Sequence, residues 1–323
     1  MWLVRMILQL LQFGIGLALL VYGADAFVRG AGTIALRMGV SRLVVGMTLV
    51  GFGTSLPELS INLTAAINGR LDIAVGNVVG SNIANVGLIL GVSALLTPLI
   101  IHVRLLRLEI PLLLLTSLAL WLLGMDGRLN PVEGGLLMLG FVGLMMVIGF
   151  GSRTEPQIVE AELEHTDSAP HALWKDIARI GLGFVLLLVA SQMMVGAAVE
   201  LARMWGMSEL TIGLTIVAIG TSLPELAASS VAAWRGDSDI AVGNVLGSNL
   251  FNILLVLGAT AVIAPIPVSP SLIRYEIPLM FLFAAALYPL AFGDNRIYRK
   301  GGALLLIAFV GFIAWQVMQP QGV

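Results

Sequence analysis

Long apolar runs alternate with short polar turns along almost the whole chain of 323 residues. A helix of about 20 residues crosses the hydrocarbon core of a bilayer, and each run is long enough for one. Strands of a membrane barrel would alternate apolar and polar residues, a pattern that this chain lacks. The pattern therefore predicts an all-α membrane protein with ten transmembrane helices, near residues 4–28, 41–68, 72–97, 106–124, 131–150, 173–202, 208–234, 239–264, 272–291 and 301–318.

The composition favours the same class of protein. Hydrophobic residues make up 58% of the chain and charged residues 11%, whereas soluble domains have about 25% charged residues. The net charge of −2 and the lack of a basic domain argue against a nucleic-acid partner. The absence of cysteine excludes disulfides and thiolate metal sites. The first apolar run is too long for a signal peptide, so we expect a retained span.

The chain repeats itself after a shift of 167 residues. The shift places "GMTLVGFGTSLPEL" (46–59) on "GLTIVAIGTSLPEL" (213–226), and "DIAVGNVVGSN" (72–82) on "DIAVGNVLGSN" (239–249). Five spans in each copy would invert the second copy, and inverted repeats are typical of secondary transporters. We therefore divide the chain into a first five-helix repeat (1–150, motif 46–98), an acidic linker (151–171) and a second, inverted repeat (172–323, motif 213–265).

The basic residues predict the orientation of the ten spans. Of the 17 lysines and arginines, 12 fall on the side of the linker and five on the other side. Cytoplasmic loops carry the excess of basic residues. We therefore expect a multi-pass protein of the prokaryotic inner or plasma membrane, with both termini outside and the central linker in the cytoplasm.

Glu58 and Glu225 lie in the middle of predicted spans, at equivalent positions of the two repeats. A carboxylate inside a membrane is costly unless it has a partner, so it indicates a functional site. A protonated glutamate with a purely structural role is the alternative. The duplication of the whole motif favours function.

Each glutamate follows a proline, Pro57 or Pro224. Proline removes one backbone N–H and displaces the carbonyl four residues earlier. These carbonyls belong to Gly53 and Gly220, and in lipid they need new partners. A cation is one possible partner, and an ordinary proline kink is the simpler alternative.

Helical spacing gathers further oxygen atoms beside each glutamate. Positions 51, 54, 55 and 58 share one helix face, as do their counterparts, and the next helix of each repeat adds a serine and an asparagine four residues apart. Such ligands suit Ca²⁺ or Na⁺ rather than zinc or copper. The candidate metal ligands are Gly51, Thr54, Ser55, Glu58, Ser81, Asn85, Ala218, Thr221, Ser222, Glu225, Ser248 and Asn252, with Gly51 and Ala218 contributing backbone carbonyls.

The motifs contain four more asparagines and two G-x-x-x-G pairs. We predict that the asparagines bridge helices and that the glycines allow close helix packing. The asparagines are Asn77, Asn82, Asn244 and Asn249, and the glycines are Gly76, Gly80, Gly243 and Gly247.

The paired "GTSLPE" and "GSNxxN" segments resemble the repeats of the cation/calcium antiporter superfamily, in its prokaryotic sodium/calcium exchanger branch. The resemblance covers essentially the whole chain and implies a central cation site on the 12 candidate ligands. It also implies that the first and sixth spans slide across a rigid core. Some members of the family carry an acidic residue where Asn252 stands, so this site has only two carboxylates.

These observations predict a secondary active antiporter that exchanges Ca²⁺ for Na⁺ by alternating access at a central site. The nearest alternative is a H⁺/Ca²⁺ exchanger with the two glutamates as proton carriers. An intramembrane hydrolase is a further alternative, but no H-E-x-x-H motif and no central histidine occur. We expect no enzyme activity, no cofactor, Ca²⁺ and Na⁺ as transported substrates, the lipid bilayer as surroundings and a functional monomer.

Overall fold

The computed structural model of the chain describes residues 2–69, 71, 74–152, 173–207 and 218–318. Eight helices in these ranges are long and apolar enough to cross a membrane. A pair of helical segments, Arg42–Thr54 and Leu56–Ile67, bent by 41°, brings this number to nine if the pair is one span. The predicted span 208–234 begins outside the described ranges. The predicted class, a helical membrane protein, agrees with this architecture.

The described helices and strands of the two halves follow one another in a similar order, although η5 has no counterpart in the second half. In the first half they are α1 (Trp2–Met38), α2 (Arg42–Val45), η1 (Gly46–Val50), α3 (Gly51–Thr54), α4 (Leu56–Ile67), α5 (Ala74–Ala84), η3 (Asn85–Leu90), α6 (Gly91–Leu96), β1 (Leu99–Ile100), η4 (Leu105–Glu109), α7 (Ile110–Leu123), η5 (Gly124–Asp126), β2 (Arg128–Leu129) and α8 (Pro131–Ser152). In the second half they are α10 (Leu173–Met204), α12 (Ala218–Thr221), α13 (Leu223–Trp234), α14 (Ser238–Phe251), η7 (Asn252–Leu257), α15 (Gly258–Ile263), β3 (Ile266–Pro267), η8 (Leu272–Glu276), α16 (Ile277–Leu290), β4 (Arg296–Ile297) and α17 (Arg299–Met318).

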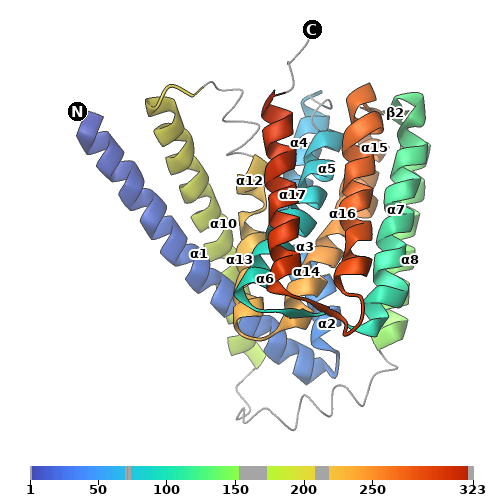
Figure 1. The fold of residues 1–323 in the computed structure, drawn as a ribbon, viewed down its shortest axis with the longest axis horizontal. Helices are drawn as coiled ribbons and strands as arrows, with labels where there is room; N and C mark the ends of the chain where they lie inside the picture. The colour runs from blue at the N-terminus through green and yellow to red at the C-terminus, as the bar shows by residue number, and fades with distance from the viewer. Residues whose placement is uncertain (1, 70, 72–73, 153–172, 208–217, 319–323) are drawn as a thin grey trace.

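The motif helices form the centre of the bundle. The most apolar windows of Ala74–Leu96 and Ser238–Ile263 are each 78% buried, whereas that of α1 is 11% buried. Figure 1 shows α1 and α10 at one edge of the bundle, running in opposite directions. We call the end where α8 ends and α10 begins the linker end, and the end where α1 begins and α17 ends the terminal end (Figure 1).

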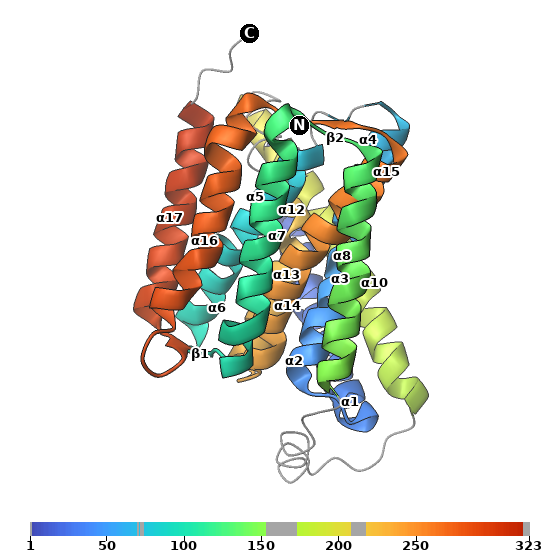
Figure 2. The same ribbon diagram turned by 90° about the vertical axis from the view of Figure 1, so that its right-hand side faces the viewer.

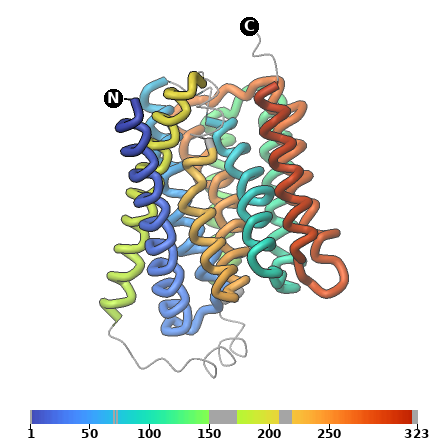
Figure 3. The backbone as a smooth tube through the Cα atoms, turned by 60° about the vertical axis from the view of Figure 1, so that its left-hand side comes forward, coloured from blue at the N-terminus to red at the C-terminus, as the bar shows by residue number. Residues whose placement is uncertain are grey.

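Helices α1 and α10 pack closely along their length, as the tube in Figure 3 shows. A Cβ atom added to Gly183 would lie 2.7 Å from the Gly23 carbonyl oxygen and 2.6 Å from the Phe27 backbone nitrogen. The absence of side chains at this crossing therefore permits the close approach of the two backbones. The two helices form a pair that is distinct from the central motif helices.

Two short antiparallel strand pairs connect the halves of the chain. Strand β1 pairs with β4, and β2 pairs with β3. Figure 2 shows β1 near the linker end and β2 near the terminal end. Each half of the chain therefore contributes one strand to the two-stranded sheet at each end of the bundle.

Several transmembrane helices contain π-helical turns at equivalent positions of the two repeats. The turn η3 begins at Asn85 and η7 begins at Asn252, which are both candidate ligands. A second equivalent pair, η4 and η8, ends at Glu109 and Glu276. A π-helical turn widens the helix locally and often marks a functional site. Hydropathy does not reveal these turns.

Candidate functional site

A break in the helix precedes each of the two central glutamates. Helix α3 ends at Thr54 and α4 begins at Leu56, while Ser55 between them has φ −81° and ψ 0°. Ser222 separates α12 from α13 with nearly the same angles, φ −89° and ψ 8°. Proline in the first turn of α4 and of α13 explains both breaks, because it cannot donate to the preceding turn. The glutamates thus lie in the first turn of a new helix, where its dipole favours a negative charge.

The two carboxylates are buried near each other. Glu58 and Glu225 are each 1% exposed. Both carboxylate oxygens of Glu58, and Oε2 of Glu225, lack a hydrogen-bond partner within the described ranges. Glu225 also experiences the charge of Glu58, while no basic side chain is among the groups that act on either carboxylate there. The carboxylates therefore require either protons or a cation to remain buried.

Four neutral oxygens of the predicted ligands are buried as well and have no hydrogen-bond partner among the residues that the structure describes. They are Ser55 Oγ, Ser222 Oγ, Asn85 Oδ1 and Asn252 Oδ1. An unpaired buried oxygen costs free energy that a bound cation would recover. Unpaired atoms therefore occur at equivalent positions of both repeats.

The bridging asparagines explain how the ligand asparagines are oriented. The Asn85 amide nitrogen donates to Asn249 Oδ1 at 2.9 Å, and the Asn252 amide nitrogen donates to Asn82 Oδ1 at 3.0 Å. Because each amide nitrogen is used in this way, the carbonyl oxygen of the same side chain remains available for a ligand. Each repeat thus donates one side-chain hydrogen bond to an asparagine of the other repeat.

Asn82 and Asn249 also bond directly to each other's backbone. The Asn82 amide donates to the Asn249 carbonyl at 3.1 Å, and the Asn249 amide donates to the Asn82 carbonyl at 3.4 Å. Asn244 donates to Ser229 Oγ at 2.8 Å. The bridging role predicted for these three asparagines is confirmed. Asn77 differs, because its buried amide nitrogen has no partner in the part of the chain that is described.

The remaining ligand candidates of α3 and α14 contact one another across the repeats. Ser248 Oγ donates to the Gly51 carbonyl at 3.3 Å, and Thr54 Oγ1 donates to Asn244 Oδ1 at 3.1 Å. A Cβ atom on Gly51 would lie 3.2 Å from the Ser248 nitrogen, so glycine permits this approach. The predicted packing role also holds for Gly243 and Gly247, whose added Cβ atoms would meet the backbone of Leu43 and Met47.

Three candidates have fewer described contacts. Ser81 is buried on α5. Ala218 begins α12, and Thr221 ends it. Thr221 lines a cavity of 460 Å³ between α4, α10 and the α12–α13 break. Gly76 and Gly80, which we predicted as packing residues, have no described atom within 4 Å of an added Cβ.

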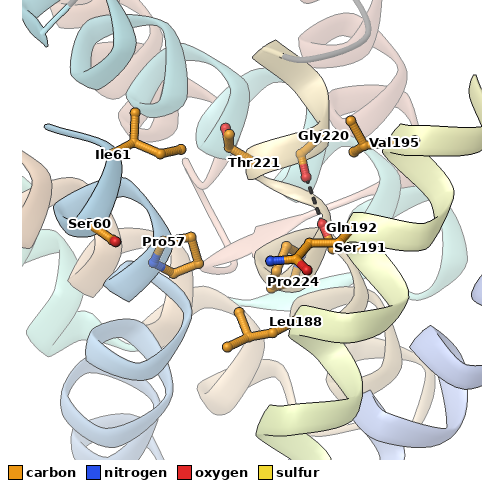
Figure 4. A pocket seen from close by; sticks show the side chains of 11 residues that line it. Pro57, Ser60, Ile61, Leu188, Ser191, Gln192, Val195, Gly220, Thr221 and Pro224 are labelled. Carbon is orange, nitrogen blue, oxygen red and sulfur yellow. Dashed lines mark hydrogen bonds between the residues drawn. The ribbon is translucent and has the colours of Figure 1, made fainter. Parts of the chain in front are cut away.

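The cavity also shows a residue that the sequence did not reveal as part of the site. Ser191 of α10 donates from its hydroxyl to the Gly220 carbonyl at 2.9 Å (Figure 4). This is one of the two carbonyls that we expected proline to displace. Only the polar pair Ser191 and Gln192 in an apolar stretch could have drawn attention to it.

The site contains hard oxygen ligands and two carboxylates. No group of three or more His, Cys, Asp or Glu side chains that could hold a metal ion occurs within the described ranges. Carboxylate, hydroxyl and carbonyl oxygens are the ligands that Ca²⁺ prefers in proteins. The arrangement therefore suits a hard cation that is held mostly by neutral oxygens.

Comparison with known proteins gives a consistent result. The profile of the sodium/calcium exchanger protein family matches residues 8–150 and 175–318. The inner membrane protein YrbG of Escherichia coli is 38% identical over 313 residues, covering 94% of each protein. The sodium/calcium exchanger MaX1 of Methanosarcina acetivorans is 32% identical over 334 residues, covering 93% of this chain and 95% of MaX1.

A solved structure has the same fold over nearly the full length. The sodium-calcium exchanger NCX_Mj, soaked with zero Na⁺ and Ca²⁺, superposes with a TM-score of 0.81 and 31% identity. The similarity covers 96% of this chain and 99% of NCX_Mj.

Proposed function

Because the chain belongs to the sodium/calcium exchanger family, we propose that it exchanges Ca²⁺ for Na⁺ across the membrane by alternating access at the central site. It is a multi-pass membrane protein and a cation/Ca²⁺ antiporter, and its relatives are transporters rather than enzymes. The hydrolase alternative is therefore set aside. Exchangers of this family transport Ca²⁺ and Na⁺ and need no cofactor.

The observation that carries the proposal is the pair of buried carboxylates, three of whose oxygens have no hydrogen-bond partner among the described residues. One Ca²⁺ would neutralise the charges of Glu58 and Glu225, and Na⁺ ions on the same oxygens would do so in turn. An empty site would leave two like charges in a medium of low dielectric constant while the helices move. Exchange rather than leak follows from this penalty. The proposed ligands are the 12 residues that the sequence predicts.

We further propose ten spans in two inverted five-helix repeats, with the boundaries predicted above. The opposite directions of α1 and α10 support this topology, as do the equivalent two-stranded sheets at the two ends of the bundle. The excess of basic residues on the linker side supports a cytoplasmic linker and external termini. A monomer suffices for transport, because both carboxylates come from one chain.

The peripheral pair α1 and α10 is the proposed moving element. Its glycine-lined contact joins the two helices tightly, while α1 buries little of its surface. Motion of this pair past the central helices would open the site alternately at the two ends of the bundle. We propose that the cavity beside α10, which Pro57 and Thr221 line, is part of the ion pathway.

A H⁺/Ca²⁺ exchanger is the second candidate. Asn85 and Asn252 do not titrate, so Glu58 and Glu225 are the available proton carriers of the site. A carboxylate that binds Ca²⁺ when charged can leave the site neutral when protonated. A H⁺/Ca²⁺ exchanger would bind Ca²⁺ at the same ligands and exchange it for protons instead of Na⁺.

The test is Ca²⁺ uptake into proteoliposomes that contain the purified protein. We expect an outward Na⁺ gradient to drive uptake at constant pH, with external Na⁺ inhibiting competitively. Uptake driven by a pH gradient without Na⁺, and unaffected by a Na⁺ gradient, would replace Na⁺ exchange by H⁺ exchange. Liposomes without protein provide the background.

A further inference from the structure

The Gly220 carbonyl occupies an unusual position in the candidate site. Residue 224, which would donate to it in a continuous helix, is a proline without an N–H group. The carbonyl belongs to the peptide unit that connects Gly220 to Thr221, a candidate ligand. The orientation of this peptide therefore depends on another partner, from the protein, from an ion or from water in the cavity that Gly220 lines.

Ser191 provides that partner from a different helix. Its hydroxyl, in a side chain that is 8% exposed, donates to the Gly220 carbonyl at 2.9 Å. Hydroxyl groups inside helices commonly donate to the carbonyl four residues earlier, as Ser117 and Thr260 do here. Ser191 instead connects α10 to α12.

The contact between these helices leaves no room for a side chain on residue 220. A Cβ atom there would lie 2.3 Å from Val195 Cγ2 of α10. The α12 backbone therefore rests directly against α10 beside the Ser191 hydrogen bond (Figure 4). Any movement of α10 relative to α12 must break or stretch this bond.

The first repeat has no equivalent bond. A shift of 167 residues pairs Ser191 with Ala24, Val195 with Val28 and Gly220 with Gly53. Ala24 has no hydroxyl group and cannot donate. In that repeat the neighbouring Thr54 donates to Asn244 of the central helix α14. The bond from α10 is therefore a feature of the second repeat.

We infer that Ser191 is a positioning residue, which couples the place of α10 to the geometry of the Ala218 and Thr221 ligands. While α10 lies against α12, the hydroxyl fixes the Gly220–Thr221 peptide and keeps the neighbouring oxygens directed at the cation. When α10 moves away, the carbonyl is released and this half of the site loosens. The inference rests on the proposed transport function and adds an asymmetry between the two halves of the site.

The test compares hydroxyl deletions on two walls of the same cavity. Ser191→Ala removes the bond, Ser191→Thr keeps a donor, and Ser60→Ala removes a hydroxyl of α4 that makes no described hydrogen bond. Ca²⁺ uptake is measured over a range of Ca²⁺ concentrations. Ser191→Ala should raise the half-saturating Ca²⁺ concentration about threefold to tenfold, the effect of losing one hydrogen bond. Its maximal rate should stay the same or rise, because the moving helix is less restrained.

We expect Ser191→Thr to restore the wild-type half-saturating concentration and Ser60→Ala to leave it within about twofold. The inference is overturned if Ser191→Ala leaves that concentration unchanged, if Ser60→Ala raises it equally, or if only the maximal rate falls. Calorimetric Ca²⁺ titration of the purified variants requires no gradient. It therefore tests Ser191 even if Na⁺-driven uptake, and with it the proposed function, fails.

Discussion

The two repeats carry nearly the same motif residues, yet they hold them in different ways. Thr54 of the first repeat bonds to Asn244 of the central helix α14. In the second repeat, the Gly220 carbonyl is held by Ser191 of the peripheral helix α10. Both halves of the site contact the core, since Asn244 also donates to Ser229 of α13, and the second half has an additional bond to the proposed moving pair. The two repeats therefore share the predicted oxygen ligands, but the hydrogen bond from Ser191 occurs in the second repeat, where the first repeat has Ala24.

The contacts of α1 and α10 show a second difference between the repeats. At the linker end Arg37 of α1 lies 3.0 Å from Asp176 of α10, and Asp25 of α1 pairs with Arg235 beyond α13. The equivalent positions of the other repeat are all uncharged, namely Met204, Gln9, Gln192 and Asn68. Ion pairs therefore hold the linker end, whereas the cavity lies beside the uncharged contact. We expect these ion pairs to favour a conformation in which the linker end is closed.

The largest expected effect tests whether the two halves of the site are equivalent. Glu58→Gln and Glu225→Gln should each reduce Na⁺-driven Ca²⁺ uptake at least about 100-fold, since losing one partner of a buried charge interaction costs about 3–5 kcal/mol. The measurement is the initial rate in proteoliposomes. If one variant retained more than about a tenth of the rate, the carboxylates would not share one cation.

The bridge between the repeats should have a smaller effect, on stability. Asn82→Ala and Asn249→Ala should each lower the free energy of unfolding by about 1–3 kcal/mol, because they leave buried amide groups unpaired. The double variant should cost less than the sum of the two, because they share bonds. Thermal unfolding of the purified proteins measures both effects.

Ser93→Ala provides the matched control for the bridge. Ser93 is fully buried, and its hydroxyl has no described partner, so its removal should not destabilise the protein. A loss of stability equal to that of Asn82→Ala would show that volume, and not the bridge, determines the effect.

The linker-end ion pairs should have the smallest effect, on the balance of conformations. Partly exposed pairs contribute about 0.2–1 kcal/mol, so Arg235→Gln should raise the population with an open linker end about 1.4-fold to fivefold. The chain has no cysteine, so a single Val28→Cys reports on this population. Val28 is buried at 1% exposure, while its counterpart Val195 lines the cavity.

We expect Arg235→Gln to increase the rate at which a thiol reagent labels Val28→Cys from the linker side. Asp126→Asn, which removes a surface ion pair with Arg128, should leave this rate unchanged. A rate that falls or stays constant in Arg235→Gln would show that the ion pair does not close the linker end.

Much of the fold and of the bridge was predictable from the sequence. Apolar runs of membrane length predicted the helices, and the motif asparagines were predicted to bridge helices, as Asn82 and Asn249 do. The first predicted span ended at residue 28, but α1 continues to Met38. Hydropathy could not show this, because the added segment contains the charged residues Arg29 and Arg37, and Arg37 pairs with Asp176, far away in the chain.

Other features depend on packing that a single sequence does not encode locally. The π-helical turns at Asn85 and Asn252 arise where central helices meet, and no residue type signals them. The bond from Ser191 requires α10 to lie against the broken helix, 29 residues further along the chain. The cation ligands themselves remain a prediction from spacing and resemblance.

Calorimetric titration of Ca²⁺ into the purified protein tests the central claim most directly, because it asks whether both glutamates hold one cation. We expect the wild type to bind Ca²⁺ at one class of site that Na⁺ competes for, and expect Glu58→Gln and Glu225→Gln each to abolish this binding. Full Ca²⁺ affinity in either variant, or two sites that are lost separately, would contradict a single site shared by the two repeats.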